Sequence, residues 1–416
     1  MSANADGAME SDGVLGMLRW LGAKIAHVRH KLRSNTVTNS RKNISYHYDA
    51  GNAMYALFLD ATMTYSSGIT HCAPSRERGP CADTVPGADG TLGTFARLQW
   101  PLEGPYDAPC LSADGGLAAN GPSADDLEES QLRKLDEVIA RAGLRPEHRV
   151  LEIGCGWGSM SLRMAQRIGC RVVGVTLSTE QLTVAQARVA AAGVGHLVDL
   201  RLQDYRHVEA ADGAGSYDRV VSIEMLEAVG HEHLPQYFAA VARLLRAGGR
   251  AVVQVIAMRN DAYARYCAGN DFIREHIFPG GHLPSLAAMD AVAAPVGLYR
   301  AATIDIGPDY ALTLREWRQR WLTRQADILA LGYSVQFFRK YEFYFAYCEA
   351  AFEFGYIHDF IATFDRKDTT GRLAEAENKQ ATAAAPVSNG LWTTACFAAA
   401  AMAIAAVTAS VVARKA

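Results

Sequence analysis

Val150-Leu-Glu-Ile-Gly-Cys-Gly-Trp-Gly158 runs from a short strand pattern into three glycines at alternate positions, and a helical pattern follows from Ser159 to Arg167. A glycine-rich turn between a strand and a helix lets a ligand approach bare backbone closely. The spacing lacks the third glycine of the dinucleotide fingerprint G-x-G-x-x-G, which disfavours a nicotinamide or flavin cofactor. Because many doubly wound proteins carry such a turn for tight packing alone, its interpretation depends on the unit that follows.

That unit supplies a second strand and its ligand-facing end. Arg171-Val-Val-Gly-Val175 has the pattern of a buried strand, and Thr176-Leu-Ser-Thr-Glu-Gln181 follows it. The first turn would hold the amino-acid end of a nucleoside cofactor, and the tip of the second strand would meet its ribose. This layout predicts a site for S-adenosylmethionine.

Strand and helix patterns alternate from Val150 to about Phe364. Further strands are predicted at 198–205, 217–224 and 250–257, the last entered through a turn at Gly248-Gly249. Alternation of this kind implies parallel pairing and right-handed crossovers. We therefore predict an α/β fold with a doubly wound, mostly parallel, Rossmann-like sheet and helical additions, whose ligand lies at the carboxyl ends of the strands.

Composition limits the class of protein. The 416 residues are half hydrophobic with a net charge of −3, so a large core is possible and no basic field would recruit nucleic acid. The eight cysteines include no C-x-x-C pair and no cysteine–histidine cluster at zinc spacing, which predicts buried thiols in a reducing compartment and no metal site. Charged residues interrupt the N-terminal apolar positions, so a secretory signal is not expected.

The N-terminal half contains two unusual segments. Residues 1–42 form a basic segment with an amphipathic helical pattern at 14–33, which suits either an anionic membrane surface or packing on the core. The main domain is expected at 43–364. Within it, residues 71–126 are rich in proline and glycine and lack periodicity, which predicts a disordered insertion.

The C-terminal region has a polar linker at 365–390 and then an uncharged run at 391–412. At about 1.5 Å per residue, a helix of this length would span a hydrocarbon core of roughly 30 Å. We predict a single-pass C-terminal anchor with the catalytic domain on the cytosolic side of a membrane. The alternative is an alanine-rich tail that never enters lipid.

Four further segments complete a set of motifs. They are Tyr46–Gly68, Ser222-Ile-Glu-Met-Leu-Glu-Ala-Val-Gly-His231, Phe272-Ile-Arg-Glu-His-Ile-Phe-Pro-Gly-Gly-His-Leu-Pro-Ser285 and Asp309-Tyr-Ala-Leu-Thr-Leu-Arg-Glu-Trp-Arg318. Together with the glycine turn, they strongly resemble the cyclopropane-fatty-acyl-phospholipid synthases, a family that includes mycolic acid cyclopropane synthases and coclaurine-type N-methyltransferases. The resemblance covers about Asn43 to Phe364 without the insertion, and it implies the class I methyltransferase fold.

By position, the resemblance implies a shell of residues around S-adenosylmethionine. The shell comprises Tyr65 and Ser66, which close over the cofactor, Gly154, Gly156 and Gly158 at its methionine end, Thr176, Leu177, Ser178 and Gln181 near the ribose, and Gln203, Asp204 and Tyr205 near the adenine. Many methyltransferases place an acidic residue at the end of the second strand to bind the ribose hydroxyls. Thr176 stands at that position, so Gln181 is the expected ribose partner.

The resemblance also implies a bicarbonate ion as the catalytic base. The residues expected to hold it are Cys155, Glu227, Gln254, the Ile256 backbone and Tyr310. Bacterial members carry histidine where Gln254 stands. Of the two acids that follow the fourth predicted strand, the motif match singles out Glu227, whereas Glu224 and Glu227 are otherwise equal candidates for a helix cap. Cys155 is expected to form a wall of the site and not a nucleophile.

The chemistry explains this choice of residues. Methyl transfer to a cis double bond produces a carbocation, and loss of one proton from the new methyl group closes a three-membered ring. The site then needs a small base and aromatic faces that stabilise positive charge. Candidates for that lining are Tyr48, Tyr65, Phe272, Tyr310, Trp317 and Tyr344.

The leading prediction is therefore S-adenosylmethionine-dependent formation of a cyclopropane fatty acid on the acyl chains of membrane phospholipid. Nucleic acid is not an expected partner, and a homodimer is a candidate assembly. One alternative is a small-molecule N-methyltransferase of the coclaurine type, which would not require the membrane-directed segments. Another is a membrane-tethered cofactor-binding protein without catalysis, against which Cys155, Glu227 and Tyr310 argue.

Overall fold

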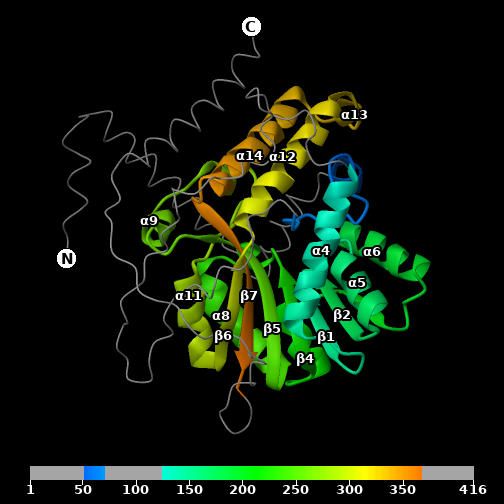
Figure 1. The fold of residues 1–416 in the computed structure, drawn as a ribbon, viewed down its shortest axis with the longest axis vertical. Helices are drawn as coiled ribbons and strands as arrows, with labels where there is room; N and C mark the ends of the chain where they lie inside the picture. The colour runs from blue at the N-terminus through cyan, green and yellow to red at the C-terminus, as the bar shows by residue number, and fades with distance from the viewer. Residues whose placement is uncertain (1–50, 71–123, 368–416) are drawn as a thin grey trace, which may run out of the picture.

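The computed structural model describes residues 51–70 and 124–367, which assemble around one seven-stranded sheet (Figure 1). The strands are β1 (Arg149–Ile153), β2 (Arg171–Thr176), β3 (Val198–Leu202), β4 (Tyr217–Ile223), β5 (Leu245–Met258), β6 (Leu298–Asp305) and β7 (Ile357–Arg366). Their order across the sheet is β3-β2-β1-β4-β5-β7-β6, with β1 to β5 parallel and β7 antiparallel to both of its neighbours. The predicted doubly wound, mostly parallel sheet is confirmed, including all five predicted strands.

Helices cover both faces of the sheet. One face carries α4 (Ala124–Ala142), α5 (Ser159–Ile168) and α6 (Thr179–Ala191), and the other carries α7 (Val208–Asp212), α8 (Leu234–Leu244) and α11 (Leu286–Ala293) (Figure 1). The sequence begins several of these helices with serine. Ser178 accepts a hydrogen bond from Gln181 N at 3.2 Å, and Ser285 accepts one from Ala288 N at 3.2 Å. Each bond satisfies a backbone donor that the first turn leaves without an intrahelical partner.

The parallel strands are buried on both sides, which accounts for their nearly continuous apolar sequence. In β5, Val252 packs in the cluster under α4 and α5, whereas Val253 and Val255 pack in the cluster under α8 and α11. Alternate residues of one strand therefore build two separate cores. The rigid sheet between those cores holds the loops at its carboxyl end in fixed positions.

A third, aromatic core closes that carboxyl end. It lies beneath α12 (Gly307–Thr323), α13 (Gln325–Ala330) and α14 (Val335–Glu353), which sit above the sheet in Figure 1. Trp317 and Trp321 of α12 are fully buried, and both pack edge-on against Phe58 of the segment that follows α3 (Gly51–Tyr55). The motif segments around residues 46–68 and 309–318 therefore meet, as far as the first lies within the described residues.

The prediction of a single-pass anchor is corrected. No helix among residues 51–70 and 124–367 is long and apolar enough to cross a membrane. The run at 391–412 lies outside the described residues, as do the basic segment 1–42, Tyr48, and nearly all of the insertion and the linker. Two boundaries differ from prediction, because α4 begins at Ala124 and β7 continues to Arg366.

Candidate functional site

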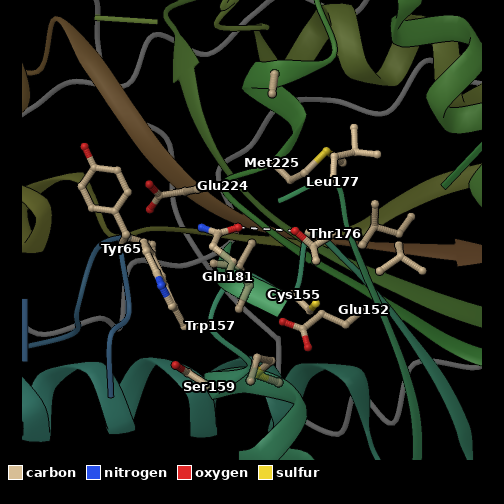
Figure 2. Close-up of a pocket in the computed structure, with 18 of the residues that line it drawn as sticks. Tyr65, Glu152, Cys155, Trp157, Ser159, Thr176, Leu177, Gln181, Glu224 and Met225 are labelled. Carbon is tan, nitrogen blue, oxygen red and sulfur yellow. Dashed lines mark hydrogen bonds between the residues drawn. The ribbon is translucent and has the colours of Figure 1, made fainter. Parts of the chain in front are cut away.

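A cavity opens at the carboxyl ends of β1, β2 and β4, where the fold class places its ligand (Figure 2). Most of the predicted cofactor residues line it: Tyr65, Ser66, Gly154, Gly156, Thr176, Leu177, Gln181, Gln203, Asp204 and Tyr205, together with Cys155 of the predicted catalytic set. Gly158 and Ser178 do not line it. The structure therefore brings together residues that are up to 140 positions apart in the sequence.

The three glycines of the turn all have positive φ, but for different reasons. A Cβ at Gly154 would lie 2.7 Å from Cγ of Met225, and one at Gly158 would lie 3.0 Å from Cβ of Ala185 in α6. A Cβ at Gly156 would meet no protein atom within 4 Å. Gly154 and Gly158 thus serve packing, whereas Gly156 keeps open the space into which a ligand fits.

Several of the residues predicted to meet the ribose and the adenine already form hydrogen bonds within the protein. Thr176 Oγ1 lies 3.4 Å from Gln181 Oε1, and Ser178 begins α6 as its cap. The carboxylate of Asp204 accepts two hydrogen bonds from the Arg206 guanidinium, at 2.8 and 2.5 Å. Burial alone would raise the pKa of Asp204, but the hydrogen bonds and charge of Arg206 outweigh burial and lower this pKa. Arg206 also lines the cavity and was missed by the sequence interpretation.

The segment 63–66 forms one wall of the cavity and is fixed by two buried side chains of α4. Gln131 Nε2 donates to the Ser66 carbonyl at 2.7 Å, and the Lys134 ammonium donates to the Ser66 hydroxyl. Burial lowers the pKa of Lys134 to about 8, because desolvation penalises its charged form. Tyr65 lies beside Trp317 and places its hydroxyl 3.0 Å from that of Tyr344.

The centre of the hydrogen-bond network is Glu224, directly after β4. Its Oε1 accepts from Ser67 N and from Gln254 Nε2, each at 2.9 Å, and its Oε2 accepts from the Tyr310 hydroxyl at 2.6 Å. Gln254 Nε2 also donates to Asp359 Oδ2 of β7 at 2.8 Å. Figure 2 shows the carboxylate of Glu224 on the same side of the cavity as Tyr65. Four elements therefore converge on one acid.

Backbone strain marks the same place. Among the described residues, the non-glycine residues with positive φ are Met63, at 56°, and Glu224, at 43°, and both line the cavity. Such a conformation costs a non-glycine residue about 1–3 kcal/mol, and it persists where the surrounding structure enforces it. At Glu224 the three hydrogen bonds hold the carboxylate in this position.

Glu227 lies one turn further along, outside the lining of the cavity. Its Oε1 accepts from Ile256 N at 2.6 Å, whereas its buried Oε2 has no hydrogen-bond partner within the described part of the chain. Burial, with a contribution from Glu224, raises the pKa of Glu227 to about 8. Glu227 and the Ile256 backbone, both expected to hold a bicarbonate ion, thus bond directly to each other, next to the Glu224 network and not inside it.

The electrostatics of the site favour a cationic ligand. Burial raises the pKa of Glu224, Asp359 and Glu152, the last to about 7, and within residues 51–70 and 124–367 the fully buried lysine beside these acids is Lys134. A ligand that brings positive charge into this cavity compensates buried carboxylates that otherwise retain protons. S-adenosylmethionine, with its sulfonium and ammonium groups, fits both this charge and the open space over Gly156.

A bicarbonate ion fits the same residues poorly. The Tyr310 hydroxyl, both protons of Gln254 Nε2 and the Ile256 amide already donate to Glu224, Asp359 or Glu227. Cys155 offers only a weak donor, whose pKa burial raises well above its usual value. A bound bicarbonate ion would lie near acidic side chains and find few free hydrogen-bond donors, because the carboxylate of Glu224 already accepts the hydrogen bonds that such an anion would need.

The sequence interpretation did not single out Lys134, Trp157 and Arg206 as functional candidates, and it named Glu224 only as the alternative to Glu227. Glu224 and Glu227 follow the same strand, and only tertiary contacts separate the one that faces the cavity from the one that does not. Lys134 lies on an amphipathic helix that also carries charged residues facing solvent. The sequence around Lys134 therefore does not show that this lysine is buried. Trp157 was visible inside the glycine turn, and its ring packs on Tyr55 at 5.2 Å while it lines the cavity.

Comparison with known proteins identifies relatives over most of the chain. The sequence profile of the mycolic acid cyclopropane synthetase family matches residues 118–360. The tuberculostearic acid methyltransferase UfaA1 of Mycobacterium tuberculosis is 36% identical over 351 residues, which cover 84% of this chain and 71% of that protein. The cyclopropane-fatty-acyl-phospholipid synthase of Escherichia coli is 30% identical over 335 residues, covering 80% and 69%.

Solved structures give the same picture. The mycolic acid cyclopropane synthase CmaA1, crystallised as a complex with SAH and CTAB, aligns with a TM-score of 0.59 and 26% identity over 78% of this chain and 98% of that one. The cyclopropane synthase MmaA2 of Mycobacterium tuberculosis aligns with a TM-score of 0.60 at 24% identity, which supports the fold alone.

Proposed function

Because this chain belongs to the mycolic acid cyclopropane synthetase family, we propose that it adds a methylene group to the cis double bond of a phospholipid acyl chain and forms a cyclopropane fatty acid. Membership makes it an S-adenosylmethionine-dependent methyltransferase that modifies lipid, as the family resemblance had predicted. The observation that carries the finer proposal is the half-buried Glu224, whose backbone is strained and whose side chain lines the cavity.

The cofactor supplies an electrophilic methyl group. The open space at Gly156 supports its assignment to the methionine end, and Gln181 on α6, which lines the cavity, is the proposed ribose partner. Tyr65 and Trp157 present aromatic faces to the cavity, which attract a sulfonium and tolerate the carbocation that follows, because π faces stabilise positive charge without reacting with it. Cys155 is a wall of the cavity, since a thiol with a raised pKa is a poor nucleophile.

We assign the base to Glu224. The substrate carbocation would form when an alkene carbon takes the methyl group while the bond from that methyl group to the sulfonium sulfur breaks, which leaves S-adenosylhomocysteine. One C–H bond of the transferred methyl group then breaks. Its electron pair closes the carbon–carbon bond of the ring, and the proton passes to the Glu224 carboxylate. Tyr310 and Gln254 hold this carboxylate in place by donating to it, and Asp359 fixes Gln254. No step requires bicarbonate.

The same acids favour an alkene over an amine as the nucleophile. An amine needs a free lone pair, and a site crowded with buried carboxylates stabilises the protonated amine, which has none. An alkene carries no proton to lose before reaction, and the charge it acquires is positive. The arrangement therefore stabilises the transition state of methyl transfer to a double bond.

The test is lipid analysis in a bacterium that lacks its own synthase and expresses this chain. We expect unsaturated acyl chains of phospholipid to gain the mass of one CH2 and to resist hydrogenation, as a ring does. If hydrogenation instead converts the modified acyl chain to a methyl-branched chain, the product is a methylene-substituted fatty acid and not a ring. Unchanged lipids, with methylation of a water-soluble amine by the purified protein, would overturn the proposal.

A further inference from the structure

Two histidines of the family motifs take no part in the cofactor cavity. His231 closes the motif that begins at Ser222, and His282 lies in the motif between Phe272 and Ser285. In the fold they converge with Cys267 of α9 (Tyr263–Ala268), and the ligating atoms of the three side chains all lie within 4.8 Å of one another. The three residues come from separate segments, which explains why their spacing in the sequence gave no metal signature.

A tyrosine hydroxyl sits between the two imidazoles. The hydroxyl of Tyr263 lies 2.8 Å from His231 Nδ1 and 2.8 Å from His282 Nε2. Cys267 follows Tyr263 by four residues on the same helix, so its thiol faces the same side. His282 is buried, Cys267 is half-buried and His231 is exposed, so the cluster has a firm base and an opening to solvent.

We propose that His231, Cys267 and His282 bind a Zn²⁺ ion, with the Tyr263 hydroxyl as fourth ligand. Two imidazoles and a thiolate are a donor set that zinc prefers, with bond lengths of about 2.0–2.3 Å in tetrahedral geometry. Donor atoms in such a site lie roughly 3.3–3.8 Å apart. To reach that geometry the ligating atoms of the three side chains, which lie within 4.8 Å of one another, must draw closer, whereas the Tyr263 oxygen, 2.8 Å from each imidazole, must move away from both nitrogens.

The metal would be structural, because none of the four ligands lines the cavity. The backbone nevertheless links the cluster to the catalytic loop. His282 N donates to the Glu227 carbonyl at 2.9 Å, and Leu283 N donates to the Tyr266 hydroxyl of α9 at 3.0 Å. An ion at this cluster would tie α9, the loop at 227–231 and the loop at 282–284 into one unit behind the acids of the site.

The test uses the full-length chain without an affinity tag, stripped with a chelator and titrated with Zn²⁺ alone. We expect one equivalent to bind in calorimetry and to raise the melting temperature. Co²⁺ in its place should give a thiolate-to-metal charge-transfer band, which Cys267→Ser abolishes. His282→Ala and the exposed-site variant His231→Asn should each weaken Zn²⁺ binding at least about a hundredfold, as expected for loss of a metal ligand.

Matched controls separate this cluster from other cysteines and histidines. Cys348→Ser and the surface variant His196→Ala should keep both the cobalt band and the zinc affinity of the unmodified chain. The proposal is overturned if the unmodified chain shows no saturable zinc site, or if Cys267→Ser keeps the band. It is also overturned if His231→Asn, which leaves the buried core intact, binds zinc as tightly as the unmodified chain. None of these readouts depends on the methyltransferase activity.

Discussion

Replacing Glu224 with glutamine removes the proposed base while leaving the shape of the site. Oε1 of Glu224 receives two N–H donors, from Ser67 and Gln254, so the glutamine oxygen must take that position. The amide nitrogen then faces the Tyr310 oxygen, which can accept a hydrogen bond. Only the hydroxyl proton of Tyr310 loses its acceptor. Because a buried charge is also removed, we expect the stability of the fold to change little.

The expected effect on turnover is large. Loss of a positioned base costs about 10²- to 10⁴-fold, which is about 2.7–5.5 kcal/mol of transition-state stabilisation. S-adenosylmethionine affinity should fall by no more than about tenfold. The variant loses one of several carboxylates near the cationic cofactor, and the attraction between that carboxylate and the cofactor is expected to contribute about 1.4 kcal/mol at most. Turnover is measured on phospholipid vesicles with methyl-labelled cofactor, and affinity is measured by calorimetry.

The control variants are Glu227→Gln and the exposed Glu232→Gln. Glu232→Gln should match the unmodified enzyme. Glu227→Gln should lower turnover less than Glu224→Gln, because Glu227 lies outside the cavity lining and binds the Ile256 amide. The reasoning is refuted if Glu224→Gln retains at least a third of the turnover while Glu227→Gln loses about a hundredfold. In that case Glu227 is the base, as the motif match alone had indicated.

Three further outcomes follow from the same geometry. Gly156→Val should abolish cofactor binding. Both Gly156→Val and Gly158→Val place a side chain at positive φ, but Gly158→Val should lower the melting temperature further because its side chain also meets Ala185. Calorimetry and thermal melts distinguish the two, and intact binding in Gly156→Val would contradict the assignment. Cofactor affinity should rise as the pH rises towards 7. Burial raises the pKa of Glu152 to about 7 when no cationic ligand is bound, so binding of the cationic cofactor releases the proton of this acid. A pH dependence of the affinity that persists in Glu152→Gln would refute this origin. Lys134→Met should move the rising limb of the pH–turnover profile to higher pH, because the nearby acids lose the cation that favours their ionised form; an unmoved profile would leave Lys134 a purely structural role.

The sequence predicted the parallel half of the sheet well and its antiparallel edge poorly. Strands β1, β2 and β4 are short, mostly apolar strands inside the sheet, and their burial leaves a clear signal, whereas β3 lies at the sheet edge and alternates between buried and exposed residues. β7 carries Asp359 and Asp365, both buried, in a stretch that looks polar, and tertiary partners compensate them: Gln254 for the first and Arg250 for the second. β6 is only half-buried at the sheet edge, so its pattern is weak.

The residues of the site also differ in how well they could be predicted, according to whether local sequence or distant partners fix them. Residues fixed by local geometry, such as Gly156 and Thr176, were predicted by position and line the cavity. Residues whose role arises from distant partners were not found. Glu224 acquires its place from Ser67, Gln254 and Tyr310, which lie on three other elements, and no local pattern separates it from Glu227. The bicarbonate prediction failed to fit for the same reason, because it assumed that the donors of this network were available to a bound ion.

The most direct test of methyl transfer followed by proton loss uses cofactor labelled with a trideuterated methyl group. Phospholipid vesicles with cis-unsaturated chains are incubated with the purified full-length enzyme, and the acyl chains are analysed by mass spectrometry. We predict that each modified chain retains two deuterium atoms, because one leaves the new methyl group as the ring closes. Retention of all three, on a lipid or on an amine, would contradict the account.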